Sequence, residues 1–301
     1  MSKGFVTIAT GNEKYFVLAR NLLRTYRYWA KDPLPFCLLC DRENEYTSEF
    51  DDVVIMENVT CSILDKVRMY QYLPYDENIF MDADALAFGD MNNWWDIFRD
   101  GSDFAAFGVQ RPLDSSAGWF DPDGIGELGK EIDWLPDFNG GCYYIRKSEV
   151  SQKCFSLAEY VLKHFDEFKF RRFQFPVDEN VFSIPLAVYH CYCQPNMPSS
   201  EFAHVCIGPA TRYVQADISK PYLHYKNKKM SYDAEVLHFG NVRTKYSLYR
   251  FQEEMFNQIQ ENKAKGLRFT LLYKYKLRFF ILRLADVRFI PARIKRKITH
   301  R

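Results

Sequence analysis

The sequence lacks the glycine-rich motifs that mark the common nucleotide-binding loops. Neither a Gly-x-Gly-x-x-Gly run nor a P-loop occurs in its 301 residues. Such loops let backbone amides approach and hold a diphosphate. Their absence disfavours a dinucleotide-binding site or an NTPase site of those kinds.

The chain also lacks an apolar run suited to a membrane span. Residues 180–200 carry no formal charge, but they include three prolines and several polar residues, so we do not expect a transmembrane helix. The N-terminus, Met1–Phe5, does not have the pattern of a signal peptide. We therefore expect a cytoplasmic protein and interpret the sequon at Asn58-Val59-Thr60 as a chance match.

A second Cys-x-x-Cys pair is missing. Cys37 and Cys40 have the spacing of metal ligands, but they lie in an apolar run typical of a buried strand. A structural zinc site of this kind needs two such pairs. We expect all eight cysteines to be reduced thiols in the core.

Acidic residues are scarce at the C-terminal end. Residues 263–301 hold 13 Lys or Arg and one acid, whereas residues 1–262 hold 27 basic and 38 acidic residues. This asymmetry indicates a tail that meets an anionic surface, and we expect residues 267–301 to contact a membrane. The alternative is a helix that packs on the domain with solvated charges. A nucleic-acid partner is disfavoured, because the rest of the chain is acidic and shows no recognised nucleic-acid module.

Length and composition fit one large soluble domain or two small ones. Hydrophobic residues make up 47% and charged residues 26% of the chain, as in ordinary globular proteins. Strand-like and helix-like patterns alternate, which predicts an α/β fold with a doubly wound sheet. We expect strands near residues 4–9, 34–40, 53–56, 79–81, 104–109, 142–145 and 236–240, and helices near 13–29, 63–72, 94–98, 149–165 and 250–265. Residues 110–138 are expected to form a long loop region.

The stretch Ile79–Asp84 is the first candidate for chemistry. Three apolar residues suited to a buried strand run directly into Asp82 and Asp84. Ligands of open α/β sheets bind beyond the carboxyl ends of strands. Side chains two residues apart point the same way if the chain stays extended, so both carboxylates could share one hard cation. A surface turn or a helix start is the alternative interpretation.

A second candidate is the short strand that ends at His238. An isolated histidine in an apolar run is more often a satisfied core residue than a ligand. Here Gly240 follows closely, and Arg243 and Lys245 supply two cations that could hold phosphate oxygens. Neutral imidazole is a good metal ligand.

Taken in order, these motifs resemble those of the GT-A glycosyltransferases. The resemblance is to the glycogenin-like and lipopolysaccharide galactosyltransferase-like group, and it covers about residues 4–250. No single motif is specific, but their order and spacing fit the group. The motifs that carry it are Thr7-Ile8-Ala9-Thr10 with Tyr15, Lys66, Asp82-Ala83-Asp84, Phe138-Asn139-Gly140-Gly141, Asp178-Glu179 and His238-Phe239-Gly240.

The resemblance implies a role for each of these positions. The metal ligands would be Asp82, Asp84 and His238, with Mn²⁺ or Mg²⁺ as the ion. The catalytic or acceptor-side pair would be Asp178 and Glu179. The donor-binding residues would be Ala9, Thr10, Tyr15, Lys66, Asp82, Asn139, Gly140, Arg243 and Lys245.

Two departures from the group leave the stereochemical outcome open. The glycogenin-like group usually has His-x-x-Gly followed by Lys-Pro-Trp, whereas here His238-Phe239-Gly240 is followed by Arg243 and Lys245. The group also tends to have Asp-Gln where this chain has Asp178-Glu179. An acidic pair is closer to inverting enzymes, in which a carboxylate acts as general base.

The sequence thus predicts a metal-dependent glycosyltransferase of the hexosyltransferase type. We expect an α/β/α GT-A domain over residues 1–250, with a mixed, mostly parallel sheet, and a basic helical extension over 251–301. The donor would be a nucleotide-diphosphate sugar, a UDP-sugar in the first place. The acceptor would be a surface polysaccharide, a lipopolysaccharide or a lipid-linked glycan at the inner face of the cell membrane. The alternatives are a nucleotidyltransferase and a non-catalytic nucleotide-sugar-binding protein.

Overall fold

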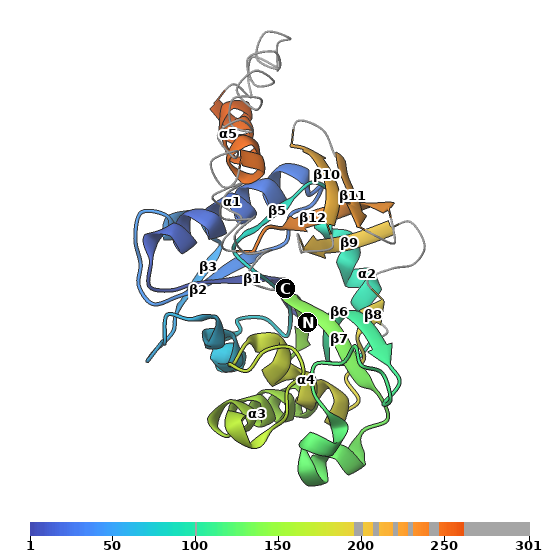
Figure 1. Cartoon of the computed structure of the whole chain (residues 1–301). Helices are drawn as coiled ribbons and strands as arrows, with labels where there is room; N and C mark the ends of the chain where they lie inside the picture. The colour runs from blue at the N-terminus through green and yellow to red at the C-terminus, as the bar shows by residue number, and fades with distance from the viewer. Residues whose placement is uncertain are drawn as a thin grey trace, which may run out of the picture.

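The computed structural model describes residues 1–99, 101–195, 201–206, 211–218, 222–227, 231–240 and 247–261. Figure 1 shows a central sheet with helices on both of its faces and a smaller second sheet to one side. Among the described residues, none of the helices has both the length and the apolar character that a membrane crossing requires.

The central sheet has seven strands in the order β3-β2-β1-β4-β7-β6-β8. Only β7 runs against the others, since it pairs antiparallel with both β4 and β6. This confirms the predicted α/β fold with a mixed, mostly parallel sheet. Its strands are β1 (Lys3–Ala9), β2 (Phe36–Cys40), β3 (Asp52–Ile55), β4 (Glu77–Met81), β6 (Phe104–Arg111), β7 (Leu135–Arg146) and β8 (Gln194–Pro195).

Helices cover the sheet on both sides. The first face carries α1 (Glu13–Trp29), α2 (Trp94–Phe98) and α5 (Ser247–Glu261), and the second carries α3 (Glu149–Lys163) and α4 (Asp178–Val188). Short 3₁₀ helices complete the fold: η1 (Thr47–Glu49), η2 (Ile63–Tyr72), η3 (Met91–Asn93), η4 (Pro122–Gly124), η5 (Gly126–Glu131) and η6 (Phe165–Glu167).

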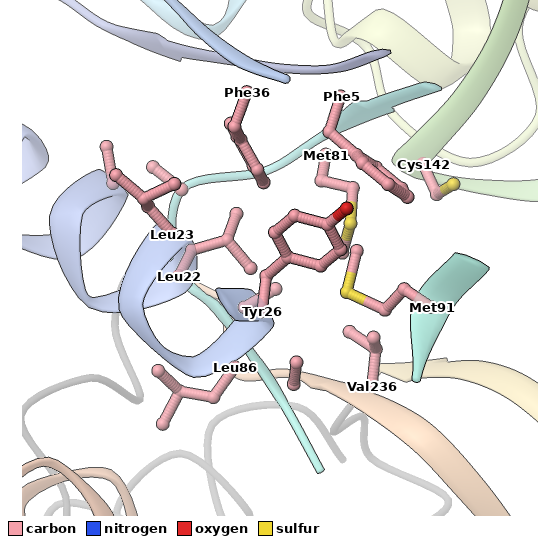
Figure 2. Packing of buried hydrophobic residues seen from close by; sticks show 14 of the residues in the cluster. Phe5, Leu22, Leu23, Tyr26, Phe36, Met81, Leu86, Met91, Cys142 and Val236 are labelled. Atoms are coloured by element: carbon pink, nitrogen blue, oxygen red, sulfur yellow. The ribbon is translucent and has the colours of Figure 1, made fainter. Parts of the chain in front are cut away.

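Two hydrophobic cores follow from the two-residue period of the strands. In β1, Phe5 and Ala9 face the α1 side, whereas Val6 faces the α3–α4 side. Figure 2 shows the first core, where Tyr26 of α1 points into the side chains of Phe5 and Phe36. The helix expected near residues 13–29 is confirmed, and one apolar stripe of α1 is buried: Phe16, Ala19, Leu22, Leu23 and Tyr26.

The second sheet joins a segment close to the aspartates with a distant part of the chain. Its strands are β5 (Ala85–Ala87), β9 (Glu201–Cys206), β10 (Thr211–Asp217), β11 (Tyr222–Asn227) and β12 (Ser231–His238). β12 pairs antiparallel with β5, so that His238 lies opposite Ala85. This pairing brings the histidine next to Asp84 although the two are far apart in sequence.

Three local expectations differ from the structure. The Asn139-Gly140-Gly141 motif lies inside the long strand β7 rather than before it. The predicted loop at 110–138 contains the end of β6, two 3₁₀ helices and the start of β7. The helix expected at 63–72 is a 3₁₀ helix, and Ser62 caps it by accepting a hydrogen bond from the Leu64 amide, as its position before the helix suggests.

α5 packs on the core of the domain. Tyr249, Met255, Phe256 and Ile259 are buried in the same hydrophobic cluster as the inner face of α1. The predicted boundary between residues 250 and 251 therefore falls within a helix that belongs structurally to the domain. The basic tail expected over 267–301 lies outside the described residues, and the division of the chain into two units stays a prediction.

Candidate active site

The two aspartates lie in a turn at the carboxyl end of β4. The Ala85 amide donates to the Asp82 carbonyl at 3.1 Å, which closes the turn between β4 and β5. The Asp82 amide donates to the Gly141 carbonyl of β7 at 3.0 Å. The extended geometry that we expected for the triplet does not persist, but the carboxylates still point into one site because both flanking strands are fixed by pairing.

His238 completes the cluster. Its Nε2 lies 3.0 Å from Asp84 Oδ1 and 3.3 Å from Asp82 Oδ2. One ligand atom from each of the three residues lies within 4.8 Å of the other two. His238 is buried, and the other ring nitrogen, Nδ1, lies 3.3 Å from Asn139 Oδ1. A hydrogen bond from Nδ1–H to that oxygen would leave Nε2 with a free lone pair facing the carboxylates.

The three side chains of this cluster shift one another's pKa values. Burial raises the pKa of Asp82, and nearby Lys66 and His238 counter this only in part. Burial opposes ionisation of Asp84 as well, but His238 lowers the pKa of Asp84 below its usual value. Burial alone would lower the pKa of His238, yet the Asp84 carboxylate raises it well above its usual value. The protonated imidazole therefore balances the two acids, and a divalent ion could take over that role.

The residues fit a divalent cation by their chemistry and by their surroundings. Two carboxylates and one imidazole are ligands that suit Mn²⁺ or Mg²⁺, and they include no thiol of the kind that holds a thiol-bound zinc ion. The backbone behind the histidine is also constrained, since a Cβ on Gly141 would lie 2.4 Å from His238 Nδ1. Only glycine leaves the imidazole in place at this point of β7. Asp82, Asp84 and His238 therefore form a candidate metal site.

Lys66 of η2 joins this site to the start of α4. Its Nζ lies 2.7 Å from Asp82 Oδ1 and 2.7 Å from Asp178 Oδ2, and it donates to the Gly140 carbonyl at 3.1 Å. The ammonium is buried, which alone would lower its pKa, but the two carboxylates raise the pKa above its usual value. Lys66 is therefore a permanent positive charge at the centre of the site.

Asp178 and Glu179 differ in their surroundings although they are adjacent. Asp178 is 1% exposed and accepts a second hydrogen bond from the Tyr143 hydroxyl at 3.1 Å. Glu179 is half-buried, and its Oε1 accepts from the Gly140 amide at 3.2 Å. Burial and the neighbouring Asp178 raise the pKa of Glu179 to about 8. Asp178 thus holds Lys66, whereas Glu179 is the more exposed member of the pair.

A pocket opens between the aspartates and the end of β1. The predicted residues Thr10, Tyr15, Lys66, Asp82 and Asp84 all line it. Ala9 is buried in the first core, and its side chain does not line the pocket, because it alternates with Ile8 and Thr10 along the strand. Arg243 and Lys245 lie outside the described residues.

Several residues at the site escaped the sequence analysis. Cys61 and Ser62 line the pocket, and Tyr143 supports Asp178. The expectation that all eight cysteines lie in the core is wrong for Cys61, which is exposed, and for Cys206, which is partly exposed. Asp65 accepts a hydrogen bond from Thr10 Oγ1 at 2.9 Å and another from the Thr60 amide at 2.7 Å, which fixes the pocket wall. Asp65 directly precedes Lys66 in the sequence. Its position beside a predicted functional lysine is the one feature by which the sequence could have indicated any of these residues.

Comparison with known proteins rests on structure alone. No family model matches the chain, and no curated protein sequence matches it. The structure of galactosyltransferase LgtC in complex with donor and acceptor sugar analogues aligns with a TM-score of 0.54 at 11% identity, over 90% of this chain and 99% of LgtC. The chain has a GT-A-like fold. An LgtC variant with an active-site glutamine replaced by glutamate aligns with a TM-score of 0.53 at 12% identity, over 86% and 95% of the two chains.

A more distant similarity is to mouse xyloside xylosyltransferase 1. It has a TM-score of 0.45 at 14% identity and covers 81% of this chain and 99% of that one.

The candidate metal site predicts that Asp84→Ala loses Mn²⁺ binding. Loss of a residue that only supports a metal ligand costs about 10- to 100-fold in affinity, so loss of a charged ligand should cost about 100-fold or more. Electron paramagnetic resonance of free Mn²⁺ during a titration measures this without any substrate. Asp96→Ala, which removes an exposed acid on α2, is the matched control and should bind like the wild type. Equal Mn²⁺ affinity in both variants would refute the site.

The environment of Glu179 predicts a pH-dependent stability. Its pKa is about 8 in the folded protein and near 4.5 in the unfolded chain. Between these values the folded state binds more protons, so this residue lowers stability as pH rises. Glu179→Gln cannot ionise, and its stability relative to the wild type should therefore increase from pH 5 to pH 9. Urea unfolding in EDTA measures this.

The control for this test is Glu127→Gln, which changes an exposed acid of η5. Its stability should follow that of the wild type at each pH. If Glu179→Gln follows the wild type in the same way, the carboxyl is not held in a protonated state.

Proposed function

We propose that this protein is a metal-dependent glycosyltransferase that moves a hexose from a nucleotide-diphosphate sugar, most simply a UDP-sugar, to a hydroxyl group of a glycan. The observation that carries the proposal is the convergence of Asp82, Asp84 and His238 beside the pocket lined by Thr10 and Tyr15. Nucleotide-sugar transfer needs these two features together, a cation site and an adjoining pocket for the nucleoside.

Each part of the site has a role in this proposal. Asp82, Asp84 and His238 would hold Mn²⁺ or Mg²⁺. When bound, such an ion acts as a Lewis acid that neutralises the leaving diphosphate. Thr10 and Tyr15 would face the nucleoside, with the backbone of Ala9 behind them.

Lys66 and β7 would position the donor sugar. The Lys66 ammonium lies at the floor of the pocket, where it adds a fixed positive charge near the phosphates. Asn139 orients His238, and the lack of a side chain at Gly140 leaves room for Asp178, since a Cβ there would lie 2.2 Å from Asp178 Oδ2. Arg243 and Lys245 are proposed to contact the diphosphate.

Glu179 is the residue that we place nearest to the acceptor. In an inverting reaction its carboxylate would remove the proton of the acceptor hydroxyl as the glycosidic bond forms. In a retaining reaction the protonated carboxyl would only position a hydroxyl group, as a carboxamide does, and the leaving diphosphate oxygen would take the proton of the acceptor hydroxyl as the bond from the anomeric carbon to the diphosphate breaks. The anomeric configuration of the product distinguishes the two.

The test is release of nucleoside diphosphate from a panel of nucleotide sugars in the presence of Mn²⁺. We expect release from one donor, and we expect EDTA or Asp84→Ala to abolish it while Asp96→Ala retains it. Release of inorganic diphosphate from a nucleoside triphosphate would instead indicate a nucleotidyltransferase. Absence of release together with absence of metal-dependent donor binding in calorimetry would contradict the proposal.

We also propose that residues 267–301 hold the protein at the cytoplasmic face of a membrane, near a lipid-linked or lipopolysaccharide-type acceptor. The support is their composition, in which basic residues alternate with aromatic and aliphatic ones. Deletion of residues 267–301 should abolish sedimentation with vesicles that contain anionic lipid. Vesicle binding that survives the deletion would refute this role of the tail.

A further inference from the structure

A groove runs along the surface between the end of α3 and the segment that leads into α4. Lys163, His164 and Glu167 lie on one side of it, and Gln174, Phe175 and Pro176 lie on the other. The second side continues within three residues to Asp178 and Glu179. One end of the groove therefore lies two residues before Asp178, the first residue of α4.

Aromatic side chains form the edge of this groove. Phe175 is 58% exposed and Phe173 is 39% exposed, and their ring centroids are 5.3 Å apart. Phe173 stacks on Trp119 at 6.1 Å, and Trp119 contacts Phe138 at 6.2 Å, one residue before Asn139. Exposed apolar side chains that adjoin one another, unlike single ones, often mark a ligand-binding groove or an interaction site. The row of rings leads from the groove to the active-site end of β7.

The segment that carries the two phenylalanines is held firmly. Arg172 forms an ion pair with Asp137 at 2.5 Å, and its guanidinium lies over the Trp119 ring. The Asn180 side chain donates to the Phe175 carbonyl at 3.1 Å and accepts from the Val177 amide at 3.0 Å. The edge of the groove is thus preformed, and a ligand would not have to order it.

The charges around the groove are largely balanced. His164 Nδ1 lies 2.8 Å from Glu167, Lys163 lies 4.0 Å from Glu159, and Arg172 is occupied by Asp137. Asp166 also lines the groove and adds a negative charge, whereas an anionic lipid surface attracts basic groups. A preformed groove with exposed aromatic faces, amide and imidazole groups and balanced charge suits an uncharged polyhydroxylated ligand.

We propose that this groove binds the sugar units of an extended acceptor glycan that lie beyond the unit receiving the new sugar. Phe175 would stack on the apolar C–H face of a pyranose ring, since the faces of aromatic rings carry negative charge that attracts such hydrogens. Gln174 would contact the ring hydroxyls. The assignment of these sugars to an acceptor rests on the proposed transferase function, whereas the binding of an oligosaccharide does not.

The test is oligosaccharide binding measured by saturation-transfer NMR, in EDTA and without donor. The probes are lactose, cellobiose, maltotriose and N,N′-diacetylchitobiose, each compared with the corresponding methyl monosaccharide. At least one oligosaccharide should bind more tightly than its monosaccharide. Phe175→Ala should weaken that binding about two- to tenfold, the range expected for one aromatic stacking contact.

Tyr192→Ala is the matched control. Tyr192 is 51% exposed and stacks on Trp134, but it lies beyond the opposite end of α4 from Phe175. Its removal should leave oligosaccharide binding unchanged.

Three results would overturn the proposal: binding of none of the probes by the wild-type protein, equal binding by Phe175→Ala, or an effect of Phe175→Ala on anionic vesicle binding alone. The last result would make this surface a membrane contact. A protein that binds oligosaccharides but neither releases nucleoside diphosphate nor binds a donor in a metal-dependent way would refute the proposed transferase function and leave the groove as a glycan site.

Discussion

The candidate site depends on one buried ammonium group. Lys66 lies between Asp82 and Asp178, 2.7 Å from each, and also reaches the Gly140 carbonyl. It joins the carboxyl end of β4, the middle of β7 and the first turn of α4. Removal of one partner from such a buried pair typically costs about 3–5 kcal/mol, because the remaining charge is left without compensation. The same contact therefore fixes the distance between the candidate metal ligand Asp82 and the first residue of α4, Asp178.

The second sheet places His238 next to the two aspartates. β12 pairs with β5 directly after the turn that holds the aspartates, so its last residue comes within 3.3 Å of both carboxylates. A strand from the end of the domain thereby completes a site that begins on β4. Burial of several charged side chains in one place costs free energy of folding. Such clusters are typical of functional sites, and this one has the residue types of a cation site.

Sequence reasoning found the residues whose types and order carry the chemistry. The run Ile79–Asp84, the helix near residues 13–29 and the strand ending at His238 could be predicted, because hydrophobic period and residue type are local properties. The contact between Lys66 and Asp178 could not, since it joins 3₁₀ helix η2 to α4 across β7. Which member of the pair Asp178-Glu179 is accessible also depends on burial, and burial is decided by packing that a single sequence does not display.

Crystals soaked with Mn²⁺ and UDP would test the central claim most directly, through an anomalous difference map recorded at the manganese absorption edge. We expect one strong peak within coordination distance of Asp82, Asp84 and His238. The diphosphate should bind on the side of the ion that these residues leave open, with the nucleoside toward Tyr15. A site without a peak, or a peak held by other residues while His238 stays paired with Asp84, would contradict it.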